Sequence, residues 1–188
     1  MDAIEAIHRR RSIRVFLDRP VERALLAELI VDAAHAPFTP SARMGAWQFA
    51  VVLGRQQLAD YGARALDYAR AHRPQLAGYE WTERPGFSIF HGAPAAVVIS
   101  GPDALPGTLA LEECTRAGQL LDIAATARGL GACWVGSPMP WLRDPATRAE
   151  LGIPEGWIPQ AAFAIGWPAI EQPARADRPP LEIQWIEG

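Results

Sequence analysis

The sequence predicts an α+β fold in which helices surround a small β-sheet. Apolar, strand-like runs alternate with segments of helical periodicity along 188 residues, a length that suits one domain with its own core. The strand-like runs are few, the first strand-to-helix turn lacks a GxGxxG pattern, and GxxxxGK(S/T) does not occur. A doubly wound dinucleotide fold and a P-loop are therefore not supported, and helices packed around a small sheet are the expected architecture.

Two helices are expected before the first strand. Ile4 and Ile7 lie on one side of residues 2–10 and charged residues lie on the other, which predicts a short amphipathic helix. Residues 20–37 begin and end with proline, and their apolar residues keep helical spacing, which predicts a second helix. Residues 38–46 (FTPSARMGA) hold small residues and a proline, which is typical of a loop.

The next elements are a strand, a helix and a long irregular segment. Residues 47–54 (WQFAVVLG) are rich in β-forming side chains, and residues 55–71 return to helical spacing. Residues 72–94 carry prolines, glycines and aromatic residues without a clear period. A loop of that length in a compact domain is usually functional, so we expect a lid over a site, with a partly ordered helical excursion as the alternative.

The second half of the chain alternates again between strand and helix. Residues 95–101 (AAVVISG) read as a buried strand, and residues 109–131 as a long, central helix that ends at a glycine. A strand is expected over 132–137 (ACWVGS), a short helix within 140–156, and another buried strand over 157–168.

The tail, residues 169–188, is rich in proline but ends in the alternating apolar stretch LEIQWI. Such an ending needs a surface to pack against. Residues 1–188 are interpreted as a single domain, with 72–94 as its lid and 169–188 as its tail.

Composition excludes several classes of protein. The formal net charge is −3, which argues against a generally basic nucleic-acid binder. All 18 basic residues are arginine, which genome composition alone can explain. The longest apolar runs, such as 95–100, are too short to span a bilayer, and the charged N-terminus has no signal-peptide core. We expect a cytoplasmic protein without a membrane or nucleic-acid partner.

No metal site or disulfide framework is expected. Cys114 and Cys133 lie in apolar surroundings without a CxxC pattern, so they read as reduced core residues. The four histidines are scattered without the spacing of metal ligands.

The stretch HRRRSIRVF (8–16) places four arginines around one serine and has three readings: a nucleic-acid clamp, a helix end, or a phosphate cradle. Cations near a helix C-terminus are favourable without any ligand, so local evidence alone favours the helix end. Guanidinium groups and a hydroxyl also suit a phosphate. Val15 and Phe16 are expected to anchor the cluster to the core, which favours a site.

Residues 129–138 (GLGACWVGSP) form the second candidate. Glycines around a short strand permit close approach of the backbone to a flat molecule, and Gly136 is the one singled out, because Gly129 and Gly131 are also explained by a helix stop and a turn. No GxSxG pattern or other nucleophile with an evident base occurs, and Glu112 and Glu113 are explained by the helix dipole. A site without a side-chain catalyst often leaves the chemistry to a cofactor.

Six motifs follow one another along nearly the whole chain: RRSIRVF, a PS-containing loop before WQFAVV, APAAVVIS, GLGACWVGS, LGIPEGWIPQAAFAIGWP and RPPLE. In this order and spacing they resemble the nitroreductase family of flavoproteins. The GLGACWVGS and LGIPEGW pair is especially similar to the flavin domain of enzymes that mature the deazaflavin cofactor F420.

The resemblance implies a homodimer that binds FMN at its interface and exchanges its C-terminal segments. It implies that Arg10, Ser12 and Arg14 hold the phosphate, ribityl chain and pyrimidine edge, with Arg11 contributing at least its backbone. It further implies that Arg178 and, more weakly, Arg175 lie at the phosphate. A second group lies against the isoalloxazine, with a backbone N–H near Gly136 facing N5: Cys133, Trp134, Val135, Gly136 and Ser137. The other subunit contributes a loop that contains Pro40, Ser41, Ala42 and Arg43.

The implied activity is hydride transfer from NAD(P)H through flavin N5 to a flat small-molecule acceptor such as a nitroaromatic or a quinone. The alternatives are an F420-type cofactor maturation reductase and a non-catalytic flavin-binding protein. The second is motivated by a departure: residues 43–46 read Arg-Met-Gly-Ala, where the family commonly has an Asn followed by Gln-Pro before the tryptophan. Trp81, Phe87 and Phe90 are candidates for the lid, although core packing explains Phe90 equally well.

Overall fold

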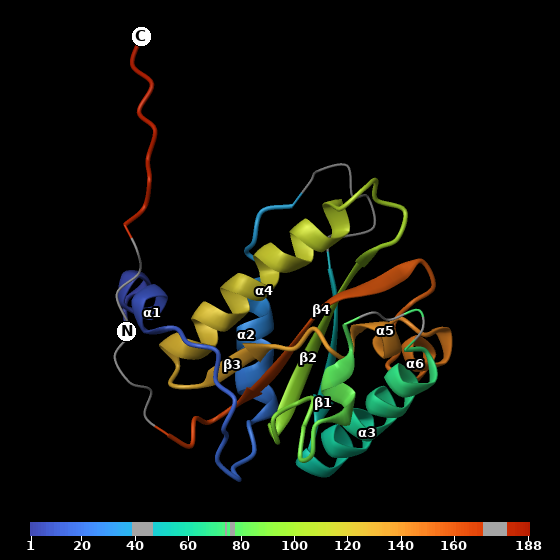
Figure 1. The fold of residues 1–188 in the computed structure, drawn as a ribbon. Helices are drawn as coiled ribbons and strands as arrows, with labels where there is room; N and C mark the ends of the chain where they lie inside the picture. Colours follow the sequence, from blue (N-terminus) through green and yellow to red (C-terminus); the bar gives the residue numbers. More distant parts are fainter. Residues whose placement is uncertain (39–46, 74, 76–77, 171–179) are drawn as a thin grey trace.

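A four-stranded antiparallel sheet forms the centre of the computed structural model, which describes residues 1–38, 47–73, 75, 78–170 and 180–188 (Figure 1). The strands stand in the order β1-β2-β4-β3, so β1 and β3 are the edges among the described strands. Their bounds are β1 Gln48–Leu53, β2 Ala95–Pro102, β3 Gly131–Trp134 and β4 Trp157–Gly166. The predicted α+β class and small central sheet are confirmed.

Helices cover both faces of this sheet. One face packs against α2 and α4, and the other packs against α3 and α5, with α6 next to α5 (Figure 1). Side chains of β2 alternate between the two layers, since Val97 and Ile99 face α4 whereas Ala96 and Val98 face α3. The helices are α1 Ala3–Arg9, α2 Arg23–Ala33, α3 Arg55–Ala71, α4 Leu109–Ala127, α5 Met139–Leu142 and α6 Pro145–Glu150, with a 3-10 turn, η1, at Glu80–Glu83.

The segment after α1 runs along the free edge of β3 and then crosses to the end of β4. The backbone N–H of Ile13 donates to Ala132 O at 2.9 Å, and that of Leu17 donates to Trp167 O at 2.8 Å. Ile13 passes so close to Gly131 that a Cβ at this glycine would overlap it. We call residues 10–17 the N-terminal strap, because they tie the end of α1 to the sheet.

The helix expected near the N-terminus is present as α1, but one expectation about this region is wrong. Val15 is 49 % exposed, and the strap is anchored instead by Ile13 and Phe16, which are buried. Ile4 and Ile7 are 64 % and 45 % exposed, so the apolar side of α1 is not covered by the described chain.

The remaining elements lie close to their expected positions, and the strand expected over 132–137 ends at Trp134. Among the described residues of the segment 72–94, the one helical element is the short turn η1. The long helix ends at Ala127, and Gly129 then adopts a φ of 76°, the left-handed conformation that stops helices.

Both cysteines are free and buried, as predicted. Within the described ranges, no cluster of histidine, cysteine or acidic side chains could hold a metal ion. No helix in the described part of the chain is long and apolar enough to span a membrane.

Candidate cofactor site

Arg10 stands at the end of α1 and reaches toward α4. Its backbone N–H caps the helix by donating to Ala6 O, and its Nη1 donates to Asp122 Oδ2 at 3.0 Å. The Arg10 side chain is 24 % exposed and the Asp122 side chain only 8 %. Among the described residues this is the one side-chain hydrogen bond of Arg10, so Nε and Nη2 remain available as donors.

Asp122 lies in the middle of α4 and was not recognised in the sequence. Burial raises the pKa of its carboxyl to about 6, although the charge of Arg10 and the hydrogen bond from Arg10 act in the opposite direction. Its second oxygen, Oδ1, is buried and accepts no hydrogen bond from the residues that the structure describes. The ion pair therefore joins the buried carboxyl of Asp122 to the partly exposed guanidinium of Arg10.

The other two arginines of the triplet serve the helix end. Arg11 Nη1 donates to His8 O and to Arg10 O, both at 2.9 Å, which satisfies carbonyl groups at the C-terminus of α1. Arg9 pairs with Glu5 one turn earlier and its side chain is 64 % exposed, as expected for a solvent-facing residue. The helix-end reading thus holds for Arg9 and Arg11, whereas Arg10 points elsewhere.

Ser12 and Arg14 are exposed and lie beside β3. Ser12 forms a parallel bridge with Ala132, and Arg14 interacts with Cys133 of the same strand. Burial lowers the pKa of His91, and the nearby charge of Arg14 lowers it further. His91 has a φ of 54°, unique among the described non-glycine residues, and sequence reasoning gave it no role. Such a backbone is costly, which makes His91 a further candidate at this site.

The end of β3 provides an accessible backbone next to the strap. Cys133 is buried, and Trp134 is 39 % exposed with its ring edge against Phe163. The N–H of Val135 donates to Ala162 O, whereas the N–H of Gly136 donates to no group in the described part of the chain. A Cβ at Gly136 would meet nothing closer than Trp134 Nε1 at 3.8 Å, so the space above this glycine is open.

The structure brings together the two stretches that the sequence singled out, residues 10–14 and 133–136, through the pairing of the strap with β3. Half-buried Ser137 follows directly. The predicted site residues Pro40, Ser41, Ala42, Arg43, Arg175 and Arg178 lie outside the described residues.

The three aromatic residues expected in the lid separate into two kinds. Phe90 is 3 % exposed and fills the core between the sheet and α3, so it is a packing residue. Trp81 and Phe87 are partly buried, with ring centroids 5.2 Å apart. Arg70 of α3 donates to Thr82 O at 2.8 Å and so ties this segment to the helix.

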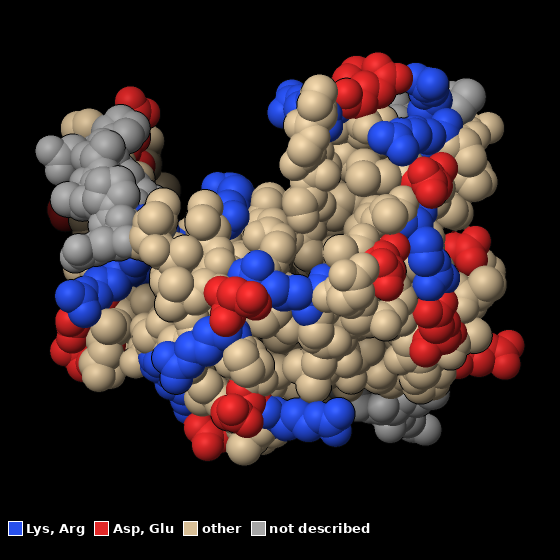
Figure 2. All heavy atoms as spheres, turned by 90° about the horizontal axis from the view of Figure 1, so that it is seen from below, with Lys and Arg blue, Asp and Glu red and all other residues tan. Residues whose placement is uncertain are grey.

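Acidic and basic side chains are interspersed on the face seen from below (Figure 2). The described residues of this face form no continuous basic stripe. That view agrees with the negative net charge in disfavouring a nucleic-acid surface.

The family model of the nitroreductase family matches residues 7–167. This chain belongs to the nitroreductase family. A relative from Methanothermobacter thermautotrophicus, named NADH dehydrogenase/NAD(P)H nitroreductase, is 31 % identical over 180 residues, which cover 94 % of this chain and 82 % of the relative. The resemblance seen in the motifs is thereby confirmed.

Solved nitroreductases have the same fold. A nitroreductase with bound FMN from Desulfitobacterium hafniense superimposes with a TM-score of 0.80 at 25 % identity, covering 100 % of both chains. One from Bacteroides fragilis, also with bound FMN, gives a TM-score of 0.79 at 23 % identity over 97 % of this chain and 98 % of that one. An FMN- and NADPH-dependent nitroreductase from Sphigopyxis sp. gives 0.74 at 24 % identity over 98 % and 99 %.

Proposed function

We propose that this nitroreductase-family chain is an FMN-dependent oxidoreductase that takes hydride from NAD(P)H and passes it to a flat acceptor such as a nitroaromatic or a quinone. FMN would supply the redox chemistry through N5 of its ring. Support comes from the family match, from the NAD(P)H nitroreductase relative and from solved nitroreductases crystallised with FMN.

The observation that carries the proposal is the donor set on one edge of the sheet. Arg10 has N–H groups that bond to none of the described residues, Ser12 and Arg14 are exposed, and all three are held on a strap that pairs with β3. Guanidinium groups and a hydroxyl are the donors that suit a phosphate and a ribityl chain. The residues present therefore fit the phosphate-bearing end of FMN.

The flat end of the cofactor fits the end of β3. The open space above Gly136 and its unused N–H permit close contact with a ring edge, and exposed Trp134 lies next to it. In this proposal Arg14 places a positive charge at the N1–O2 edge of the ring, where negative charge develops during reduction. Cys133 to Ser137 line the ring, and partly buried Trp81 and Phe87 border the acceptor.

The spectrum of the purified protein tests the proposal directly. We expect a yellow protein, or a colourless apoprotein that acquires flavin absorbance when FMN is added. NADH or NADPH should then bleach this absorbance anaerobically, and a nitroaromatic or quinone should restore it. A protein that gains no flavin signal with FMN contradicts the proposal.

The same assay separates the alternatives. Bleaching that is reversed only by F420-type acceptors would assign the chain to cofactor maturation. Bound FMN that neither nicotinamide reduces would identify a flavin-binding protein without turnover.

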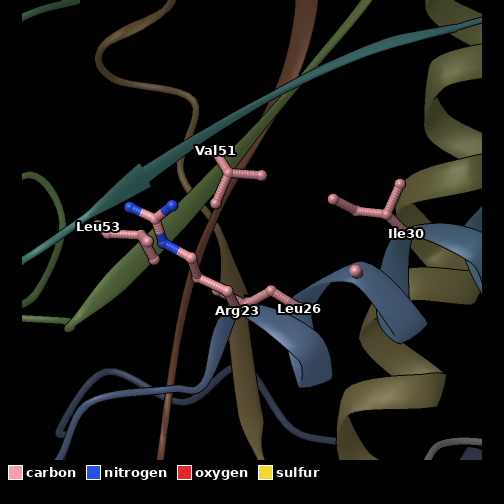
Figure 3. Close-up of a pocket in the computed structure, with 6 residues that line it drawn as sticks. Arg23, Leu26, Ile30, Val51 and Leu53 are labelled. Carbon is pink, nitrogen blue, oxygen red and sulfur yellow. The ribbon is translucent and has the colours of Figure 1, made fainter.

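We also propose that the chain forms a homodimer in which each tail packs on the partner. A cavity of about 320 Å³ opens between α2 and the free edge strand β1, lined by Arg23, Leu26, Ala27, Ile30, Val51 and Leu53 (Figure 3). Leu181, Trp185 and Ile186 in the last residues are 81 %, 78 % and 90 % exposed, so this apolar stretch needs a surface. The tail of a second copy matches the cavity in apolar character, and an edge strand can accept a further strand. In such a dimer Arg178, Arg175 and Pro40 to Arg43 would reach the cofactor sites.

A further inference from the structure

The buried carboxyl of Asp122 sits directly behind Arg10, the residue that the proposed function places at the cofactor phosphate. Its side chain is 8 % exposed and its one hydrogen bond from the described residues comes from Arg10. Oδ1 is buried without a partner among those residues, which leaves a position where a proton can bind. The inference below concerns this carboxyl and rests on FMN binding at Arg10.

Without a bound phosphate, two opposing effects set the protonation of Asp122. Burial disfavours the carboxylate and raises the pKa to about 6, while the Arg10 guanidinium favours the carboxylate. The thiol of Cys133, on the neighbouring strand β3, also interacts with Asp122. Arg10 is the cation that the described surroundings supply to this carboxylate, so the ionised form depends on it.

A phosphate at Arg10 changes this balance in one direction. The dianion shares the guanidinium charge and brings negative charge to the far side of Arg10. At the effective dielectric of a protein surface, one unit charge roughly 8 Å away shifts an equilibrium by more than about tenfold. The carboxylate therefore becomes less favourable when the phosphate is bound.

We infer that Asp122 takes up a proton from solvent when the cofactor phosphate binds to Arg10, so that cofactor retention weakens as pH rises. The sign follows from linkage: a group that is protonated more readily in the complex than in the free protein adds affinity at low pH and loses it at high pH. By becoming neutral, Asp122 leaves the positive charge of Arg10 to the bound phosphate.

Other titrating groups make distinguishable contributions. The second pKa of a phosphate monoester is near 6, and binding to arginines favours its dianion, so FMN itself can only release a proton. His8 in the last turn of α1 and His91 near Arg14 are the histidines closest in the chain or in space to these arginines. A variant without the carboxyl group of Asp122 shows whether the proton is taken up by Asp122 or by another group.

Titration calorimetry of FMN into the full-length apoprotein at pH 7, repeated in buffers with different ionisation enthalpies, measures the proton count. We expect the wild-type chain to take up roughly half a proton or more per FMN, and its affinity to fall roughly tenfold between pH 6.5 and 8. The Asp122→Asn variant should take up no proton when FMN binds, and its affinity for FMN should change by less than about threefold between pH 6.5 and 8. Asp32→Asn, which removes a carboxylate of α2 that pairs with Arg128 at 2.7 Å, should behave as the wild type.

Each outcome decides the inference. Wild-type binding without proton uptake overturns it while leaving the proposed function intact, and this measurement does not require a folded variant. Uptake that persists in Asp122→Asn also overturns it and points to a histidine. An apoprotein that binds no FMN contradicts the proposed function instead.

Discussion

Neighbouring arginines in one short stretch serve different purposes, and unused donors distinguish them. Arg9 and Arg11 are engaged with Glu5 and with carbonyls of α1, whereas Arg10 and Arg14 leave that helix end and approach α4 and β3. Composition indicates a basic cluster, but it does not show which arginines serve the helix end and which approach α4 and β3. That distinction depends on the direction in which the strap leaves the helix.

Arg14→Ala should weaken FMN binding by roughly tenfold to a hundredfold, because a charge-assisted hydrogen bond contributes about 1.5–3 kcal/mol. Quenching of FMN fluorescence on titration with apoprotein measures the affinity. Arg9→Ala is the matched control, since this exposed side chain pairs only with Glu5 among the described residues, and its affinity should be unchanged. Equal effects of both substitutions would mean that only the overall charge matters.

Some residues at the site gave no signal in the sequence. Asp122 sits in a long helical pattern in which a single acidic residue reads as solvent-facing, and His91 lies in a segment without a period. Glu113, attributed to the helix dipole, is fully buried. Asp122 could have been noticed because it interrupts an apolar run with residues on more than one face, but its partner Arg10 is 112 residues away.

At the scale of elements, glycines determine how closely the strap can approach the sheet. Periodicity placed α3 at 55–71 as observed, because seventeen residues of regular spacing leave little ambiguity. The strap crosses over Gly131 because of tertiary contacts. The sequence therefore showed the glycine, but it did not show that Ile13 packs against it. For the same reason Val15 was expected in the core, where Ile13 lies instead.

Gly131→Ala and Gly136→Ala should have different consequences. A Cβ at position 131 overlaps Ile13, so this variant should lose about 1–3 kcal/mol of stability, measured by urea unfolding. A Cβ at position 136 meets only open space, so that variant should unfold like the wild type but bind FMN less tightly, because the methyl group would occupy the place proposed for the ring. Unaltered FMN affinity in Gly136→Ala would remove this glycine from the site.

At the scale of the whole molecule, the two edges of the sheet differ in whether the described chain covers them. The strap covers the edge of β3, whereas β1 is an edge next to the cavity against α2. The sequence predicted the strands and the helices, but not the order β1-β2-β4-β3, because the partners of each strand are distant in the chain. It predicted a tail in need of a surface without indicating which surface.

Ala27→Glu should weaken the proposed homodimer and lower FMN retention, because it puts a charge into the cavity where the partner's tail would pack. Deletion of residues 180–188 should have the same effect. Ala24→Glu provides the control, since it is an exposed residue of the same helix that does not line the cavity. Light scattering after size-exclusion chromatography measures the mass, and a wild-type chain that elutes as a monomer would contradict the dimer.

The strap also constrains when the site can form during synthesis. Ser12 pairs with Ala132, and Val15 accepts a hydrogen bond from the N–H of Ala169, so residues near the start are held by residues near the end. Contacts of such long sequence separation form late in folding. A ribosome-bound chain therefore presents Arg10, Ser12 and Arg14 without their scaffold until about residue 169 has emerged, and cofactor loading belongs to the completed chain.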